Sequence, residues 1–181
     1  MQKRTKSEAI IMGTTGASGV KRFFIGSVAA KVLELSNVPV LVIPENFRLK
    51  PIKKIGYASD LSHVQKDLEQ IKPFSELMKS SVEVFHIEPM FPASEACLNF
   101  KADKEIPALH AKNGFVDWQY KLIRTRFDND FFAGIENYRR NPKPDMLAII
   151  THKRNWLGKN LNPSHSKGLA YHTTIPVLSI K

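Results

Sequence analysis

The sequence predicts an α/β protein built on a parallel sheet, and two observations lead to this fold class. Apolar segments typical of strands alternate along the chain with segments typical of helices. Such alternation produces parallel sheets, because each helix returns the chain across the sheet in a right-handed crossover. In addition, a strand–helix–strand pattern occurs near both ends of the 181 residues. The chain is therefore expected to contain two related parts.

The repeat is clearest in two pairs of short segments. NVPVLVIP at 37–44 returns as TIPVLSIK at 174–181, with the prolines of the PVL triplets 137 positions apart. AIIMGT at 9–14 returns as LAIITH at 147–152, which the letters align with an offset of 138. In both copies an apolar strand leads through a polar loop and a helix, which begins with GSVAAKVLELS in the first copy, into a strand that opens with Pro-Val-Leu.

Between the two copies the predicted elements alternate in order. KKIGYA at 53–58 is expected to form a strand that ends in the polar turn SDLS. Ser62 is expected to cap a helix over 63–79, in which Pro73 predicts a kink. SVEVFHI at 81–87 alternates between apolar and polar residues, as a strand does.

The following connection is long and irregular, with a helix expected at 105–113. WQYKLIRTRF at 118–127 alternates again and predicts a strand. The helix DFFAGIENYRR at 130–140 is expected to end before two prolines. DMLAII at 145–150 is a nearly continuous apolar run and predicts a buried strand.

This order predicts the domain organisation. Residues 53–181 contain a complete βαβαβαβαβ series, whereas residues 1–44 contain only the counterparts of its last strand, helix and strand. We therefore predict a remnant of a first domain at 1–44, a linker at 45–52 and a complete second domain at 53–181. The sequence leaves open whether Met1 is a natural start or a truncation.

The spacing of the glycines in the first copy resembles the motif of a known protein family. Gly13 and Gly16 are separated by two residues, and nine residues later Gly26 is followed by Ser27. With PVLVIP downstream, this spacing resembles the nucleotide-binding branch of the universal stress protein family. IGYASDLS and VEVFHIEP are similar to the first two strands of that family. The resemblance covers nearly the whole chain and implies a tandem protein with a truncated first domain.

The resemblance implies a fold and a function. The fold is an open, Rossmann-like parallel sheet of five strands in the order 3-2-1-4-5, flanked by helices and related to the adenine nucleotide alpha hydrolases. ATP or ADP is expected at the ends of strands 1 and 4, where strand order reverses. The implied role is a non-catalytic stress-response module whose fifth strands pair antiparallel across a two-fold or pseudo-two-fold axis.

The predicted nucleotide-binding residues are Gly13, Gly16, Gly26 and Ser27. Glycines without Cβ atoms allow the backbone to approach phosphate oxygens, and the amino end of a helix favours an anion. The alternative is a plain turn with Ser27 as a helix cap.

The second copy departs from this pattern, because it has Thr151 in place of Gly13 and Pro163 in place of Gly26, while Ser164 is retained. We therefore expect no nucleotide on its own loop. The resemblance associates Asp60 with the nucleoside, but Asp60 fits a turn and cap position equally well. No complete nucleotide site can be assembled within one copy.

Composition limits the remaining functions. The net charge of +10 is spread along the chain, which favours a solvated basic surface over a nucleic-acid partner. The single Cys97 excludes an intrachain disulfide and fits a reducing, cytoplasmic location. No apolar run is long enough to span a membrane, and the histidines show no ligand spacing, so neither a membrane segment nor a metal is predicted.

Two other functions remain as alternatives. The first is an interaction module whose nucleotide site is vestigial and binds no ligand. The second is an ATP-hydrolysing enzyme, which would need a carboxylate base that the first copy does not contain. Apolar strands without a complete domain around them predict self-association, through the PVLVI and PVLSI strands and through the N-terminal remnant, and hence a homo-oligomer.

Overall fold

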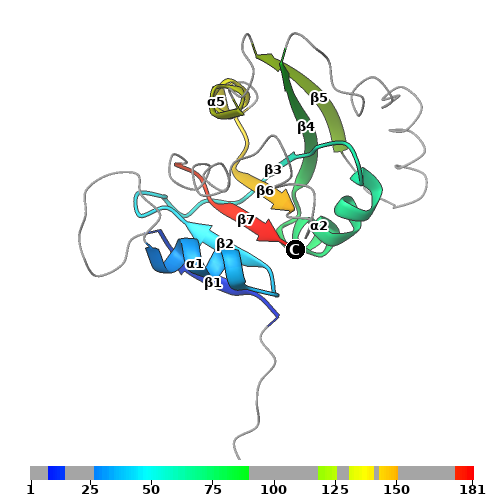
Figure 1. Cartoon of the computed structure of the whole chain (residues 1–181). Helices are drawn as coiled ribbons and strands as arrows, with labels where there is room; N and C mark the ends of the chain where they lie inside the picture. Colours follow the sequence, from blue (N-terminus) through cyan, green and yellow to red (C-terminus); the bar gives the residue numbers. More distant parts are fainter. Residues whose placement is uncertain (1–7, 15–26, 90–117, 126–130, 141–142, 151–173) are drawn as a thin grey trace, which may run out of the picture.

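The computed structural model describes residues 8–14, 27–89, 118–125, 131–140, 143–150 and 174–181. Its strands form one seven-stranded sheet in the order β1-β2-β7-β6-β3-β4-β5 (Figure 1). The described strands are β1 (Ile10–Gly13), β2 (Val40–Ile43), β3 (Lys54–Ala58), β4 (Ser81–Pro89), β5 (Trp118–Thr125), β6 (Met146–Ile150) and β7 (Val177–Ile180). The described helices are α1 (Ser27–Leu35), α2 (Val64–Met78) and α5 (Phe131–Arg140).

The predicted α/β fold class is confirmed. The strands from β3 onward lie in the order β5-β4-β3-β6-β7, and neighbours among them run parallel. Numbered from β3, this is the expected order 3-2-1-4-5. The sheet nevertheless has seven strands rather than five, because β1 and β2 extend it beyond β7. The division of the chain at 1–44, 45–52 and 53–181 stays a prediction.

The two PVL strands pair with each other inside the chain. β2 runs antiparallel to β7, with Leu41 opposite Leu178 at the centre of the pairing. The other edge of β2 carries β1, and the other edge of β7 carries β6. The expected antiparallel pairing of the fifth strands is thus confirmed within the chain. Both edges of both strands are occupied by it and by β1 and β6, so the expectation that these strands also pair with a second molecule is corrected.

Strand register corrects the alignment of the repeat by one residue. Ile10 lies beside Val40 in the first copy, and Leu147 lies beside Val177 in the second. Since the two valines are 137 positions apart, Ile10 corresponds to Leu147 with the same offset. The offset of 138 expected for this strand is therefore wrong, because apolar runs without a marker residue align equally well one position apart.

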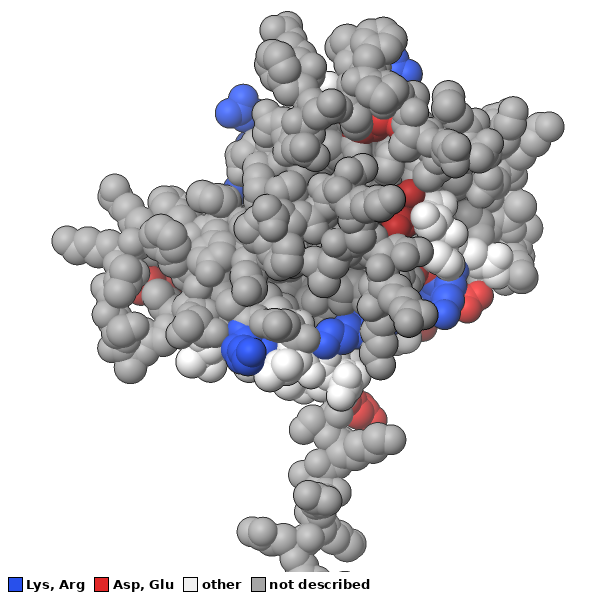
Figure 2. Space-filling view, in the orientation of Figure 1, with Lys and Arg blue, Asp and Glu red and all other residues white. Residues whose placement is uncertain are grey.

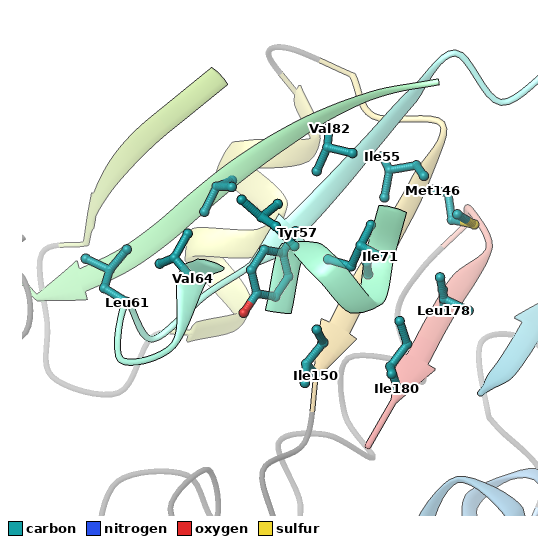
Figure 3. Packing of buried hydrophobic residues seen from close by; sticks show 13 residues of the cluster. Ile55, Tyr57, Leu61, Val64, Ile71, Val82, Met146, Ile150, Leu178 and Ile180 are labelled. Atoms are coloured by element: carbon teal, nitrogen blue, oxygen red, sulfur yellow. The ribbon is translucent and has the colours of Figure 1, made fainter. Parts of the chain in front are cut away.

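Helix α2 covers one face of the sheet. Its apolar side chains pack with residues of β3, β4, β6 and β7, several of which are completely buried (Figure 3). The core members are Ile55, Tyr57, Leu61, Val64, Leu68, Ile71, Val82, Val84, Met146, Ala148, Ile150, Leu178 and Ile180. Because residues alternate between faces along a strand, the remaining apolar positions point to the opposite side.

Helix α5 packs on that opposite side. Its Tyr138 stacks on Phe85 of β4, with ring centroids 3.8 Å apart. Tyr138 also lies directly over Gly56, where a Cβ would come within 2.5 Å of the ring. Glycine is therefore required at this position of β3. A smaller cluster of Ala29, Val40 and Val42 joins α1 to β1 and β2.

The start of α2 differs from the expectation. The N-cap is His63 rather than Ser62, and no side chain caps the first turn. Ser62 is held instead by the preceding turn, where its N–H donates to Asp60. Pro73 is exposed within the helix, which extends to Met78. The helix predicted at 105–113 lies outside the described residues.

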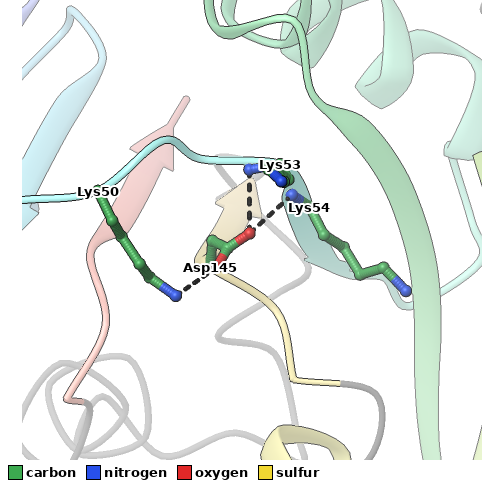
Figure 4. A network of polar contacts seen from close by, with 4 residues as sticks. All are labelled: Lys50, Lys53, Lys54 and Asp145. Atoms are coloured by element: carbon green, nitrogen blue, oxygen red, sulfur yellow. Dashed lines mark hydrogen bonds and ion pairs between the residues drawn. The ribbon is translucent and has the colours of Figure 1, made fainter.

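One carboxylate attaches the segment before β3 to the start of β6. Asp145 Oδ1 lies 2.5 Å from Lys50 Nζ, and Asp145 Oδ2 accepts hydrogen bonds from the N–H groups of Lys53 and Lys54 at 2.9 and 3.1 Å (Figure 4). Burial alone would raise the pKa of Asp145, but these hydrogen bonds outweigh it and lower the pKa.

Candidate functional site

Gly13 lies at the carboxyl end of β1, in parallel register with Ile43 of β2. The N–H of Thr14 donates to the Ile43 carbonyl at 3.1 Å and continues the pairing by one residue. A Cβ built on Gly13 would meet only the Ile43 carbonyl oxygen, 4.0 Å away. The described chain therefore does not require glycine here for packing, because no other described atom lies within 4 Å of that position.

The amino end of α1 lies at the same end of the sheet as Gly13. A parallel strand–helix–strand unit places the start of its helix at the carboxyl end of its first strand. Helix α1 starts at Ser27, so the positive end of its dipole belongs to this end of β1. Gly16 and Gly26 lie outside the described residues, so of the predicted phosphate-binding residues only Gly13 and the backbone of Ser27 are placed.

Ile150 stands in the second copy where Gly13 stands in the first, by the offset of 137. It is buried at 3% exposure and belongs to the core beneath α2. Thr151, which the sequence aligned with Gly13, is one residue too far and lies outside the described chain, as do Pro163 and Ser164. The carboxyl end of β6 thus has a packed side chain where β1 has a glycine that no described side chain approaches.

The turn after β3 contains Asp60. Asp60 Oδ1 accepts a hydrogen bond from the N–H of Ser62 at 2.9 Å, and Ser59 Oγ accepts one from the N–H of Leu61 at 3.0 Å. Leu61 has a φ of 67°, a left-handed conformation that costs a non-glycine residue about 1–2 kcal/mol. These side-chain hydrogen bonds hold the strained turn, which is the turn role expected as the alternative for Asp60.

Asp60 and Gly13 lie at opposite ends of the sheet. Strands β3, β6 and β7 are parallel, and β2 and β1 run antiparallel to them. The carboxyl end of β1 therefore points the opposite way from the carboxyl end of β3. Three strands also separate β1 from β3, which amounts to about 19 Å across the sheet. No single nucleotide can contact both residues within one chain.

His86 of β4 is a polar residue that sequence reasoning treated only as a strand position. Its Nδ1 lies 2.7 Å from the carbonyl oxygen of Ser59. Because a carbonyl oxygen only accepts, Nδ1 carries the proton in this contact. Among the described residues, Nε2 is buried without a hydrogen-bond partner. The alternation of Val84 and His86 predicted the buried face but gave no signal of this contact.

A second buried polar contact lies beneath α2. The hydroxyl of Tyr57 donates to Asp67 Oδ2, and both residues are at most 2% exposed. Burial raises the pKa of Tyr57 above its ordinary value, and the negative charge of Asp67 raises it further as the second-largest cause. The phenol therefore stays protonated as a donor, which indicates a structural role in attaching α2 to β3.

Other candidate groups are limited by what the structure describes. The described residues contain no cluster of three His, Cys, Asp or Glu side chains suited to a metal ion. Cys97 lies outside them. None of the described helices is long and apolar enough to cross a membrane. On the face seen in Figure 2, the described Lys and Arg side chains lie in separate places.

Comparisons with known proteins agree with this architecture. The model of the universal stress protein family matches residues 1–44. Universal stress protein MJ0531 of Methanocaldococcus jannaschii is 44% identical over 41 residues, which are 23% of this chain and 24% of that protein.

Two solved structures share the fold. A universal stress protein from Archaeoglobus fulgidus DSM 4304 has a TM-score of 0.68 and 17% identity, over 96% of this chain and 62% of that one. A putative universal stress protein from Pseudomonas aeruginosa UCBPP-PA14 has a TM-score of 0.61 and 18% identity, over 96% of this chain and 63% of that one.

The chain spans about a quarter of the curated relative and less than two thirds of these solved chains. The sequence match is confined to the first strand–helix–strand unit, whereas the likeness of fold extends over nearly the whole chain. Residues 1–44 therefore match the universal stress protein family, and nearly the whole chain shares the fold of these solved structures.

Proposed function

We propose that the chain is an adenine-nucleotide-binding stress-response module that works in the cytoplasm without catalysing a reaction. In this proposal the phosphates of ATP or ADP lie at the carboxyl end of β1. Gly13, Gly16 and Gly26 provide close backbone approach, and Ser27 at the amino end of α1 adds N–H and hydroxyl donors.

The observation that supports the proposal most directly is that no described side chain packs against Gly13. A glycine whose Cβ would contact only one carbonyl oxygen at 4.0 Å is not explained by packing in the described chain. A phosphate oxygen that accepts backbone hydrogen bonds needs such a side-chain-free approach. The start of α1 at the same end of the sheet adds a partial positive charge, and the net charge of +10 attracts anions toward the protein.

The geometry favours binding over catalysis. Asp60 lies at the other end of the sheet from Gly13, so it cannot act as a base on a phosphate bound there. Hydrolysis requires a group that positions or activates water within hydrogen-bond reach. A phosphate-release assay on protein freed of contaminating ATPase is expected to show no turnover above buffer, and sustained turnover that depends on Gly13 would contradict the non-catalytic role.

Nucleotide binding is tested by titration with a fluorescent ATP analogue. Gly13→Val and Gly16→Val are each expected to weaken binding at least about tenfold, because side chains then fill the space of the phosphate. Asp60→Asn is the matched control and should bind as the wild type does, since Asp60 lies at the opposite end of the sheet. Equal binding by the wild type and Gly13→Val would reject the site.

The second candidate function is an interaction module with a vestigial nucleotide site. It is favoured by the apolar surface of β1, where Ile11 is 68% exposed. In this case nucleotide titration gives no binding, whereas light scattering shows an average mass that rises with protein concentration. A constant monomeric mass across micromolar concentrations would count against this alternative.

A further inference from the structure

Basic side chains gather at one end of the sheet. β2 runs antiparallel to β7, whereas β7, β6, β3 and β4 run parallel to their neighbours in this series. The amino ends of these four strands therefore lie where β1 and β2 have their carboxyl ends. The segment before β3 and the last turns of α2 and α5 reach the same place, since each of them leads into one of these strands. We use the term basic end for the Lys and Arg residues found there, three of which are drawn in Figure 4: Arg48, Lys50, Lys53, Lys54, Lys79, Arg139, Arg140 and Lys143.

Acidic side chains offset only part of this positive charge. The described acidic residues at the same end of the sheet are Glu45, Glu76, Glu83 and Asp145. Two of them pair with Lys50 and Lys54, at N–O distances of 2.5 and 3.5 Å. Lys53, Arg140 and Lys143 are exposed and take part in neither pair. The basic end therefore keeps an excess of positive charge.

The opposite end of the sheet has no such excess among the described residues. It is formed by the carboxyl ends of β3, β4, β5, β6 and β7 and by the first turn of α2. The charged residues there are Asp60, Lys66, Asp67, Glu88, Arg124 and Lys181, in which acidic and basic side chains balance. Within the described chain, positive charge is thus concentrated at the end of the sheet where Gly13 lies.

The last turn of α5 also shares one face of the sheet with α1. Leu41 packs against the core beneath α2, so its neighbours Val40 and Val42 point to the other face, where they pack with α1. Helix α5 covers that same face. In its last turn, Arg139 Nη2 donates to Thr174 Oγ1 at 2.6 Å, shortly before β7 begins. Two strand spacings, about 10 Å, separate β7 from β1.

Charges at these distances act on an anion before it makes contact. The amino ends of β7, β6 and β3 lie about 10, 14 and 19 Å from β1 across the sheet. Electrostatic interactions are screened over about 30 Å at 0.01 M salt but over about 10 Å at 0.1 M salt. The basic end therefore attracts an approaching anion as a whole at low salt, and salt weakens this attraction. Such steering raises association rates by about 10- to 1,000-fold.

We propose that the basic end steers nucleotides toward the carboxyl end of β1 and favours ATP over AMP, because the triphosphate carries more negative charge. This preference rests on the proposed nucleotide site and adds to it a choice among adenine nucleotides and a dependence on salt. The basic side chains act from a distance and accelerate association. The dissociation rate of the bound nucleotide depends on the groups that touch it, so it changes little when distant charges are removed.

Steering is tested by stopped-flow measurement of the association of fluorescent ATP and AMP analogues with the full chain. The steering variant removes three exposed charges of the basic end, with Lys53→Gln, Arg140→Gln and Lys143→Gln. The control variant removes three exposed charges of the opposite end, with Lys66→Gln, Arg124→Gln and Lys181→Gln. Both variants have the same net charge, so they differ only in where the charge is lost.

The position of the lost charge should decide the rate. At about 20 mM salt, ATP association with the steering variant should be at least about threefold slower than with the wild type, whereas the control variant should stay within about 1.5-fold. Dissociation rates should agree within about twofold among the three proteins. Equal association rates for the two variants, with melting curves like that of the wild type, would overturn the proposal, because net charge alone would then set the rate.

The wild-type chain provides a second readout that needs no variant. Raising the salt from about 20 to about 300 mM should slow ATP association about tenfold and AMP association only about threefold, since the attraction grows with the charge of the ligand. Equal salt dependence for ATP and AMP would overturn the proposal, even if the steering variant failed to fold.

Steering and the nucleotide site fail separately. ATP binding that depends on Gly13, at the same association rate in both variants, supports the site and rejects steering. No ATP binding by the wild type rejects both. Slower association in the control variant alone would put the nucleotide at the opposite end of the sheet and also reject both.

Discussion

Strands β1 and β6 are copies of one sequence pattern in two different surroundings. β6 lies between β3 and β7, and every residue in it is buried. β1 has one described neighbour, and its residues alternate between half-buried and exposed. The comparison teaches that an apolar run is enough to form the strand, whereas burial depends on the strands and helices placed around it.

Gly56 and Gly13 extend the comparison to glycine. A Cβ on Gly56 would come within 2.5 Å of the Tyr138 ring, whereas one on Gly13 would meet a single carbonyl oxygen at 4.0 Å. The first glycine is required by packing inside the protein. No described atom explains the second, which is why we propose it for phosphate binding.

The largest difference between β6 and β1 is expected in the stability lost when an apolar side chain of each strand is truncated. Leu147→Ala in β6 should lower the free energy of unfolding by about 2–5 kcal/mol, because Leu147 is 1% exposed and its removal leaves a cavity. Ile11→Ala in β1 should change it by less than about 0.5 kcal/mol, since Ile11 is 68% exposed. Urea unfolding measures both. Equal losses would show that β1 is as well covered as β6.

The next effect is expected at Gly56. Gly56→Ala should cost about 1–3 kcal/mol, because the added methyl group overlaps the Tyr138 ring and must displace α5. Adding Tyr138→Leu should make the combined loss smaller than the sum of the single losses, since the ring that clashes is then gone. Strict additivity in urea unfolding would mean that Gly56 is required for another reason.

A smaller effect is expected at the start of β6, where Asp145 is anchored. Asp145→Asn should cost about 1 kcal/mol at pH 7, because it removes the charge that accepts hydrogen bonds from Lys50, Lys53 and Lys54. Glu8, the counterpart by the offset of 137, is exposed, so Glu8→Gln is the matched control and should change stability little.

The Asp145 contribution should also depend on pH. Its folded pKa is lowered, so the folded state binds fewer protons than the unfolded state, whose Asp pKa is about 3.9. The wild type should exceed Asp145→Asn by a constant amount above about pH 5. The difference should disappear as the pH falls below 3.9 through the folded pKa. If the stability difference between the wild type and Asp145→Asn keeps its full size well below pH 3.9, it does not come from ionisation of Asp145.

The smallest effect is expected at Gly13. Gly13→Ala should raise stability by about 0.5 kcal/mol, because alanine restricts the unfolded chain and its methyl group meets no close neighbour among the described residues. Thermal unfolding at matched concentration measures the shift. A clear loss of stability would show that the glycine is required by the fold rather than kept free for a ligand.

The sequence predicted the architecture well because the signals are local. Apolar runs and turn residues located all seven described strands, and the family resemblance implied the antiparallel pairing of the fifth strands, here β2 and β7. The residue-level errors arose where local signals are ambiguous. Ser62 and His63 both lie at the start of α2, and the carboxylate of Asp60 holds Ser62 in the turn.

The candidate site was predictable only in part. The glycine spacing indicated a phosphate loop, but the opposite directions of β1 and β3 follow from antiparallel pairing in the middle of the sheet. That consequence concerns residues 47 positions apart in sequence, Gly13 and Asp60, and needs the complete strand order. The contact of His86 with the Ser59 carbonyl could not be predicted from the sequence either, because it depends on how the ends of two neighbouring strands lie side by side.

The central claim is that a nucleotide binds at the carboxyl end of β1. Changes in amide chemical shifts on titration with ATP locate the binding site directly. In a ¹⁵N-labelled chain titrated with ATP, we predict shifts at Gly13, Thr14 and the first residues of α1. The turn at 59–62, at the opposite end of the sheet, should remain unchanged. Shifts confined to residues 59–62, with none at Gly13, would contradict the assignment of the phosphate site to the first copy.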